Sequence, residues 1–441
     1  MAMVVKNNMS AVNTLNILNR NQSALAKSLQ KVSSGMKIND AGDDASGYAI
    51  SERMRVQIRS LDQDKQNTQN GNSMMKTAEG AVASTVEILK TLKEKAINAA
   101  NDTNTDEDRR TIQKEINQMV DQIDDNALAT YNGKYLVDGS RNSIGTATCT
   151  TLTNNALSTA SAWASVLTDL QSRQNESLNI QSTDNVTVSY VRQGRTYTTT
   201  FSVGNQTLAD IIGKTAFNGT DSVKGSSMVG GTTAGAWIGL DKAGNSVYTA
   251  DNKTALSINA AGAGTTFQVS AFTIGITDNT GALRKTANTA LDGFNERIRA
   301  ENKSEDNALV LQTGVKSNQA IKVSMTDMRS LALGMKGTDG SVISVQTQDK
   351  ANAAINSIDS ALQKALDEQA NIGAVQTRLR YTASNLTTQS ENVQNSESTI
   401  RDADMAKEMT EYTKNNVLLQ AAQSMLAQAN QNSSAVLSLL R

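Results

Sequence analysis

The sequence contains no proline and no histidine among its 441 residues, and its single cysteine is Cys149. Without histidine, the chain lacks the commonest general base and the commonest metal ligand of enzymes. With one cysteine, neither a disulfide framework nor a thiolate zinc site can form within the chain. These absences exclude most classes of catalytic centre, so we expect a protein that is not an enzyme and that uses no cofactor and no metal.

Aromatic residues and excess charge are also scarce. Phe, Trp and Tyr make up 3% of the chain, and its formal net charge is -1. A near-neutral chain has no electrostatic footprint for nucleic acid or an anionic membrane, and no transmembrane span is visible. The opening stretch MAMVVKNNMSAV lacks the basic and long apolar segments of a conventional secretory signal. The expected partners are therefore proteins, further copies of this chain included.

The chain does have a helical apolar pattern at each end. Apolar residues spaced by three or four positions indicate an apolar stripe along one face of a helix. We call these two patterns the terminal stripes. The amino-terminal stripe consists of Val5, Met9, Val12, Leu15, Leu18, Leu25, Leu29 and Val32. The carboxy-terminal stripe consists of Met405, Met409, Tyr412, Leu419, Ala422, Leu426, Ala429, Val436 and Leu440, joined near its end by Leu437 and Leu439.

Each terminal stripe is narrow and has polar flanks, so each terminal helix needs a partner with a matching stripe. An antiparallel pairing of the two ends would place Lys31 near Glu408. It would likewise place Lys27 near Glu411, as at the flanking positions of a coiled coil. The same pattern also suits an ordinary pair of terminal helices that caps a globular domain. The two interpretations differ in whether neighbouring molecules complete the burial.

A loop and long helices are predicted next along the chain. Residues 35–51, GMKINDAGDDASGYAIS, are rich in Gly, Asp and Asn, which is typical of a structured loop. We interpret Asn39, Asp43 and Asp44 as capping and turn residues, because their spacing does not match an EF-hand calcium loop. Long helical patterns cover residues 46–100 and 351–393. A capping box at Thr105 and Asp108 begins a further helix.

The composition changes near Arg141, and the helical pattern returns after Lys303. Apolar alternation around Gln193-Gly194 predicts a β-hairpin over residues 186–203, and a further strand is expected over 266–276. The sequence therefore predicts a mainly α protein with antiparallel paired terminal helices, a long-helix bundle with a β-hairpin, and an inserted α+β or mostly β outer domain. The expected domains are residues 1–45, 46–143, 144–302, 303–398 and 399–441.

Several long motifs in the chain resemble those of the bacterial flagellins. On the amino side these are LQKVSSGMKINDAGDDASGYAIS at residues 29–51 and the Asn132-Gly133-Lys134 turn that leads to Gly139. On the carboxy side they are IRDADMAKEMT at residues 400–410, MLAQANQ at 425–431 and the ending VLSLLR. The insert between Arg141 and Lys303 carries no resemblance that we use.

The resemblance implies a structural subunit that polymerises with itself into the extracellular helical filament of the bacterial flagellum, for swimming motility. Members of the family are exported unfolded through the flagellar type III apparatus, with an export chaperone as a partner. They assemble beneath a filament cap and beyond hook–filament junction proteins. The terminal stripes would then lie in the filament core, and the loop with Asn39, Asp43, Asp44 and Gly47 would be the family's spoke loop.

Innate immune receptors of host cells recognise the family, and the matching face here departs from the family's pattern. The family's Leu-Gln-Arg-Val-Arg-Glu-Leu corresponds to residues 89–95, which begin at Leu89, and Glu115 matches an acidic contact on the following helix. Thr91 stands where the family has an arginine, and Lys95 stands where it has the last leucine. The resemblance therefore implies a candidate receptor face of Leu89, Thr91, Lys95 and Glu115 that is recognised weakly.

Two other classes of protein stay open at this point. A hook–filament junction protein shares the terminal helices, although the MLAQANQ run and the VLSLLR ending favour the filament subunit. A secreted adhesin or lectin would carry its ligand site in the insert. A flagellin with an enzymatic insert is also conceivable, but a zinc-protease HExxH signature requires histidine. Filaments formed by purified protein would favour the subunit, whereas glycan binding by the isolated insert would favour the binding module.

Overall fold

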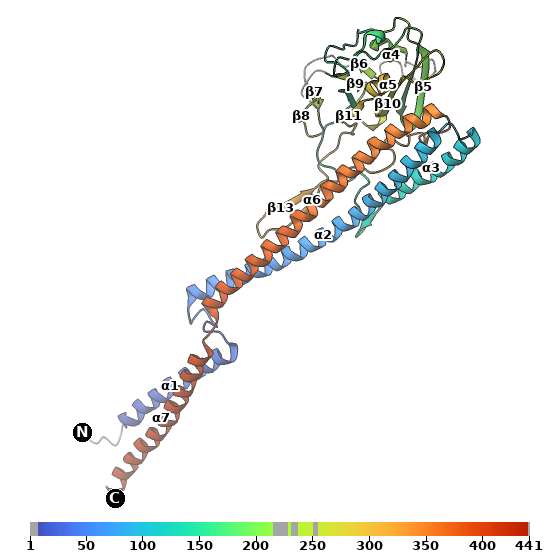
Figure 1. Cartoon of the computed structure of the whole chain (residues 1–441). Helices are drawn as coiled ribbons and strands as arrows, with labels where there is room; N and C mark the ends of the chain where they lie inside the picture. Colours follow the sequence, from blue (N-terminus) through green and yellow to red (C-terminus); the bar gives the residue numbers. More distant parts are fainter. Residues whose placement is uncertain (1–7, 215–227, 231–236, 250–254, 440–441) are drawn as a thin grey trace. The chain divides into compact units, whose positions relative to one another are not determined.

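The computed structural model describes residues 8–214, 228–230, 237–249 and 255–439 (Figure 1). The chain forms two compact units. The terminal unit comprises Met1–Thr68, Gln312–Gln319 and Tyr381–Arg441, and the central unit comprises Gln69–Leu311 and Ala320–Arg380. Two long helices, α2 (Ala45–Ala100) and α6 (Gln348–Arg401), supply residues to both units. None of the described helices is long and apolar enough to cross a membrane.

The terminal unit contains a helix pair, α1 (Met9–Ser34) and α7 (Met405–Leu439), which lie side by side (Figure 1). Asn8, which caps the start of α1, donates a side-chain hydrogen bond of 3.1 Å to the Ala429 carbonyl near the end of α7. The two helices therefore run antiparallel. The predicted pairing of the two ends of the chain is confirmed.

The charges beside this pair agree with the prediction at one of two positions. Lys31 Nζ lies 3.7 Å from Glu408 Oε1, as predicted. Lys27 Nζ instead lies 3.5 Å from Asp43 Oδ1 in the loop after α1, so the predicted contact of Lys27 with Glu411 is wrong. The helical pattern gives no information about the loop, which brings a carboxylate close to Lys27.

The central unit contains a helical bundle of α2, α6 and α3 (Asp106–Ala127). Thr105 accepts from the Asp108 backbone N–H at 3.3 Å, and the Asp108 carboxylate accepts from the Thr105 N–H at 2.9 Å. The predicted capping box is therefore confirmed. On α2 the buried residues recur every three or four positions. Those in the bundle include Met75, Ala78, Val82, Val86, Leu89, Leu92, Ala96 and Ala99.

Extended segments cover the bundle and pair in two short hairpins. Strands β1 (Thr130–Tyr131) and β2 (Lys134–Tyr135) are joined by Asn132 and Gly133, both with positive φ, as the Asn-Gly turn predicts. Strands β12 (Leu309–Gln312) and β13 (Ala320–Val323) form the second hairpin.

A buried amide ties α3 to another of these extended segments. The Gln113 side chain donates to the Ile343 carbonyl at 2.9 Å and accepts from the Val345 N–H at 2.7 Å. Both hydrogen-bonding groups of this buried amide are therefore satisfied, as the low polarity of the surroundings requires.

The insert has a core of its own between two sheets. One sheet has the antiparallel order β10 (Val269–Thr277), β4 (Asn185–Arg192) and β5 (Arg195–Ser202). Gln193 and Gly194 join β4 to β5 with φ values of 48° and 70°, so the predicted hairpin is confirmed. The other sheet has the order β11 (Phe294–Ile298), β3 (Thr151–Asn154), β9 (Leu256–Ala260) and β6 (Met228–Gly230).

Smaller elements complete the insert. Helices α4 (Leu208–Lys214) and α5 (Lys285–Leu291) contribute Leu208, Ile211 and Leu291 to the core between the sheets. Two 3₁₀ turns, η1 (Leu167–Asp169) and η2 (Thr265–Phe267), and a separate hairpin of β7 (Trp237–Leu240) and β8 (Ser246–Tyr248) connect the strands.

The chain enters and leaves the insert at adjacent positions. Gly145 and Ser304 form an antiparallel bridge in which each backbone N–H donates to the other's carbonyl at 3.1 Å. The Asn307 N–H donates to the Asn142 carbonyl, also at 3.1 Å. A short linker could therefore replace everything between the bridge residues.

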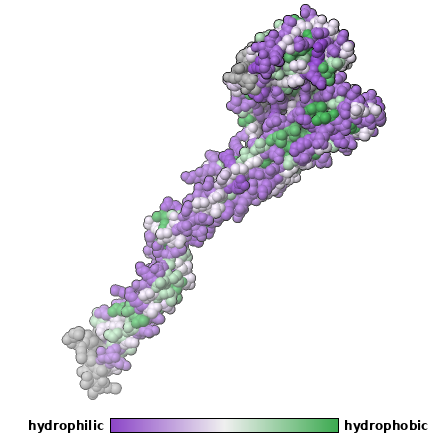
Figure 2. All heavy atoms as spheres, viewed as in Figure 1, coloured by the Kyte–Doolittle hydropathy of each residue, from purple (hydrophilic) through white to green (hydrophobic). Residues whose placement is uncertain are grey.

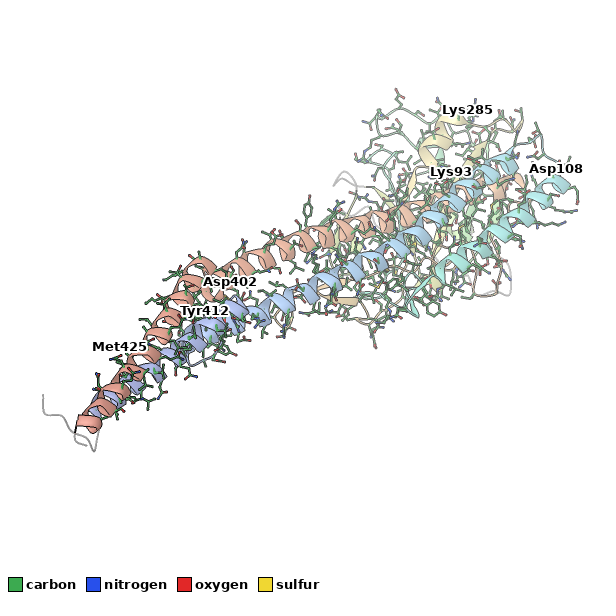
Figure 3. The ribbon with its side chains drawn as sticks, turned by 90° about the horizontal axis from the view of Figure 1, so that it is seen from below. Lys93, Asp108, Lys285, Asp402, Tyr412 and Met425 are labelled. Carbon is green, nitrogen blue, oxygen red and sulfur yellow. The ribbon has the colours of Figure 1, made fainter. Side chains whose placement is uncertain are left out.

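A buried arginine holds the end of α6 to the start of α2 in the terminal unit. The Arg401 side chain is 6% exposed, and its Nη1 lies 2.6 Å from Glu52 Oε1. Its guanidinium also lies over the Tyr48 ring, 5.3 Å from the centroid. The next residue, Asp402, begins the break before α7 (Figure 3). The Ala403 N–H then donates to the Gly35 carbonyl at 2.9 Å.

We predict that Arg401→Ala lowers the free energy of unfolding by about 2 kcal/mol, because it removes a charge-assisted hydrogen bond and a cation–π contact. The matched control is Arg55→Ala, which removes a more exposed cation 3.2 Å from the same Glu52 carboxylate and should cost less than about 0.5 kcal/mol. Urea denaturation of the monomer, followed by circular dichroism, measures both. Equal losses for the two variants would contradict the assigned role of Arg401.

Candidate assembly surface

Small residues are the fully buried ones where α1 and α7 meet. Among the side chains of these helices that the structure describes, the buried ones are Ser28 on α1 and Ala422 and Ala429 on α7, each with less than 9% of its surface exposed. The Asn415 amide donates to the Ser28 hydroxyl at 3.0 Å. Small side chains allow two helices to approach closely but bury little apolar area. The fully buried positions therefore contribute little hydrophobic stabilisation, and half-buried side chains such as Leu18 and Leu419 contribute part of what their size allows.

Ten large apolar side chains of the same helices are exposed, and we call these ten together the assembly surface. Figure 2 shows hydrophobic residues along this helix pair, and Figure 3 labels Met425 on α7. Each side of the pair contributes five of them. On α1 they are Met9, Val12, Leu15, Ile17 and Leu29, with 45–63% of each residue exposed. On α7 they are Met405, Met409, Val417, Leu418 and Met425, with 42–62% exposed.

Part of the assembly surface is hollowed. Met409, Val417 and Leu418 line a shallow, mainly apolar groove of about 590 Å³ along α7, together with the stem of Lys414. Exposed apolar surface that is contiguous and rimmed by polar residues marks a contact with another molecule. The groove is therefore the part of this surface best suited to receive apolar side chains.

The terminal stripes divide between the helix pair and the assembly surface. Six stripe residues are half-buried at the helix pair, and Ala422 and Ala429 are buried beside them. The six are Leu18, Leu25, Val32, Tyr412, Leu419 and Leu426. Exposed are Met9, Val12, Leu15, Leu29, Met405 and Met409. Val5 and Leu440 lie outside the described residues. Val436, Leu437 and Leu439 belong to the last turns of α7, but their side chains lie outside the described part.

The expectation that each whole stripe faces the partner helix is therefore wrong for its exposed members. The helices approach most closely at Ser28, Ala422 and Ala429, and the larger side chains around these positions are either half-buried or exposed. Sequence analysis also missed four residues of the assembly surface. They are Ile17, Val417, Leu418 and Met425. Ile17, Leu418 and Met425 each lie next to a stripe position, and Val417 precedes Leu418, so a search for a second stripe on the same helix could have found them.

The loop between α1 and α2 is held by its own side chains. Asp43 accepts from the Asn39 backbone N–H at 3.3 Å, and this hydrogen bond lowers the pKa of the Asp43 carboxyl. Asp44 accepts from the backbone N–H groups of Ser46 and Gly47 at 3.1 and 3.0 Å and so caps α2. A Cβ atom at Gly47 would collide with the Asp44 carboxylate. The interpretation of these residues as capping and turn residues is confirmed.

The candidate receptor face is only partly available on the surface. Leu89 is fully buried, so its assignment to an exposed face is wrong: it packs into the core of the bundle. Thr91 donates its hydroxyl to the Glu87 carbonyl of the same helix at 3.0 Å. Lys95 Nζ lies 2.6 Å from Glu115 Oε2 on α3. Two of the candidate contact residues are therefore already paired with each other.

No candidate metal centre accompanies these features in the part of the chain that the structure describes. Within it, no group of three or more acidic, histidine or cysteine side chains converges in a way that could hold a metal ion. Cys149 is a half-buried free thiol. The feature that requires a functional explanation is therefore the assembly surface.

Comparison with known proteins agrees with this geometry. Residues 5–142 match the family described as the bacterial flagellin N-terminal helical region, and residues 355–440 match the bacterial flagellin C-terminal helical region. The two matches include α1, α7 and most of the two long helices. The outer sheets lie between the matched segments.

Relatives align with almost the entire chain. Flagellin of Clostridium tyrobutyricum is 35% identical over 97% of this chain and 99% of its own length. Flagellin of Bacillus subtilis (strain 168) is 30% identical over the full length of both chains. The solved flagellar junction protein FlgL from Legionella pneumophila aligns with 80% of this chain at 16% identity and a TM-score of 0.31, which is too low to carry an argument. The chain therefore belongs to the bacterial flagellins, the structural subunits of the flagellar filament.

Proposed function

We propose that the assembly surface joins copies of this chain to one another in the filament core. The observation that carries the proposal is that ten large apolar side chains of α1 and α7 stay exposed after the two helices have paired. Fully burying one such side chain contributes roughly 1.5–3 kcal/mol. Contacts between neighbouring copies would supply this burial, and a contact between different faces of successive subunits extends into an open helical polymer.

The proposal extends to how the subunit reaches the filament. We infer that the chain is exported unfolded through the flagellar type III apparatus with the help of a chaperone, and that it assembles beneath a cap protein and beyond hook–filament junction proteins. The composition supports this route. A chain without proline has no slow prolyl isomerisation to complete, and a chain with one cysteine needs no disulfide formation before it assembles.

Host innate receptors are proposed as further partners, with weak recognition by the toll-like receptor for flagellin. Thr91 lacks the guanidinium that the family's arginine presents as a planar fork of donors. Lys95 is engaged with Glu115 at 2.6 Å, so a receptor would have to separate this ion pair or leave it in place. The ending VLSLLR, which cytosolic sensors recognise in the family, is present.

We predict that the double variant Val417→Ser, Leu418→Ser raises the critical concentration for filament assembly by about tenfold or more. The variant loses the burial of two apolar side chains between copies. A loss of roughly 1.4 kcal/mol in binding free energy corresponds to a factor of ten. The monomer should keep its stability, since these residues are 57% and 42% exposed before assembly. Sedimentation of filaments at a series of protein concentrations measures the effect.

The matched control replaces Ile144 and Leu283, which are 71% and 65% exposed in the insert, by serine. This pair removes a similar apolar area away from α1 and α7, and it should leave the critical concentration unchanged. Equal changes of the critical concentration in the two double variants would contradict the proposal that the assembly surface joins the copies.

The insert should be dispensable for polymerisation. We predict that deletion of residues 146–303, with a short linker from Gly145 to Ser304, still yields filaments, because these two residues already lie side by side. The shortened monomer should unfold at a lower temperature, since Val191 and Ala271 of the insert pack into the core of the bundle. Electron microscopy and thermal denaturation test the two parts. A variant that folds but never assembles would contradict the prediction.

We predict that Thr91→Arg combined with Lys95→Leu strengthens receptor signalling by about tenfold or more, since central interface residues often carry about 2 kcal/mol. The measurement is a dose–response curve of monomer on receptor-bearing cells. Lys90→Ala on the same helix is the control, because Lys90 pairs with Glu87 at 2.7 Å and its loss should change little. Equal potency of the wild type and the double variant would overturn the assignment.

A further inference from the structure

The methionines of the chain are divided unevenly between its core and its surface. Five of them are buried in the core of the bundle, each with 7% or less of its surface exposed. They are Met74, Met75, Met325, Met328 and Met335. Among the methionines whose side chains the structure describes, four are exposed, with 42–63% of each residue accessible. These four, which we call the surface methionines, are Met9, Met405, Met409 and Met425, and all of them belong to the assembly surface.

The surface methionines lie toward both ends of the helix pair. Met9 begins α1, and Met425 lies near the end of α7 (Figure 3), where the Asn8 side chain bonds to the Ala429 carbonyl. Met405 begins α7 at the opposite end of the pair. A change in the chemistry of methionine would therefore affect the assembly surface along its length.

One surface methionine also lines the apolar groove. Met409 contributes to this groove beside Val417 and Leu418. Methionine side chains are flexible and polarizable, so they adapt well to the irregular contact between two molecules. The thioether sulfur of Met409 would then lie against apolar atoms of a neighbouring copy.

Exposed thioethers react with peroxides. One oxygen atom of hydrogen peroxide is transferred to the methionine sulfur, which gives up two electrons, while the O–O bond breaks and the remaining oxygen leaves as water. The product is methionine sulfoxide, a polar side chain that disrupts methionine-rich interfaces. Because burial shields the five core methionines, an oxidant should modify the assembly surface before the core.

Sulfoxide formation should affect the monomer and the filament differently. In the monomer, water can hydrate the new oxygen at an exposed position, so the fold has no reason to change. In an apolar contact between copies, the same oxygen would become a buried acceptor without a donor, which is unfavourable. Oxidation should therefore weaken assembly without unfolding the subunit.

We propose that the surface methionines are a modification site for peroxides, and that their oxidation prevents a monomer from joining the filament. This inference rests on the proposed function, because it requires copies to meet through the assembly surface. Subunits already in a filament are protected, since the same contact removes their thioethers from solvent. The unassembled subunit is the sensitive form.

Partially oxidised wild-type protein tests the proposal within a single sample. Monomer is treated with hydrogen peroxide, circular dichroism establishes that it is still folded, and assembly is stopped while part of the protein remains in solution. Peptide mass spectrometry then measures sulfoxide at each methionine in sedimented filaments and in the remaining monomer. We expect sulfoxide at the surface methionines to be about tenfold less frequent in the filaments.

The matched control is Leu283→Met, which places a thioether in the insert at a position that is 65% exposed. The replacement nearly conserves volume. Sulfoxide at position 283 should be equally frequent in filaments and in remaining monomer. The proposal is overturned if sulfoxide at the surface methionines is also equally frequent in both fractions, or if position 283 is depleted from filaments as strongly as they are.

A second measurement identifies the residues responsible. The variant with leucine at all four surface methionines keeps Cys149, a half-buried thiol that peroxide can also oxidise. Each protein is compared with its own untreated sample. Peroxide should raise the critical concentration of wild type by about tenfold or more and leave that of the variant unchanged. Equal sensitivity of the two proteins would assign the effect to another residue and overturn the proposal.

The Val417→Ser, Leu418→Ser double variant separates this inference from the proposed function. If peroxide leaves assembly of wild type unchanged while the double variant assembles poorly, only the role of the surface methionines is wrong. If neither treatment nor substitution changes the critical concentration, the assembly surface itself is wrong.

Discussion

Among their described side chains, helices α1 and α7 fully bury only small residues where they meet, and the behaviour proposed for the terminal unit depends on that contact. Ser28, Ala422 and Ala429 are buried in the pair, whereas Val12, Leu418 and their large apolar neighbours are exposed. Ordering a residue costs about 1–2 kcal/mol of backbone entropy, which small side chains offset poorly. The helix pair therefore has limited stability alone, and its apolar surface remains free for neighbouring copies.

Other parts of the chain position the helix pair and have apolar cores of their own. Arg401 fixes the end of α6 to the start of α2 through Glu52 and Tyr48, next to the break from which α7 begins. The bundle and the insert each have an apolar core, so the central unit does not depend on α1 and α7 for its own burial. A subunit built in this way can fold its central unit by itself and leave its terminal helices for assembly.

Local sequence signals predicted much of the fold. The capping box at Thr105 and the turns at Asn132-Gly133 and Gln193-Gly194 are short-range features, and the structure contains all three. Helical spacing also identified the terminal helices and the long helices α2 and α6. Periodicity could not tell which side of a helix faces its partner, because the stripes of α1 and α7 are flanked by further apolar residues. Leu89 was assigned to the receptor face from the family's motif alone, and the motif gave no information on its burial.

Features that depend on distant residues were beyond sequence reasoning. The contact of Lys27 with Asp43 requires the path of the loop between them. The hydrogen bonds that join Gln113 to Ile343 and Val345 link residues 230 and 232 positions apart, and no local pattern connects them. The most direct test of the account is a helical reconstruction of the filament by electron microscopy. We predict that Val12, Leu15, Val417 and Leu418 are buried against neighbouring copies; if they face solvent or the central channel instead, the proposed assembly surface is wrong.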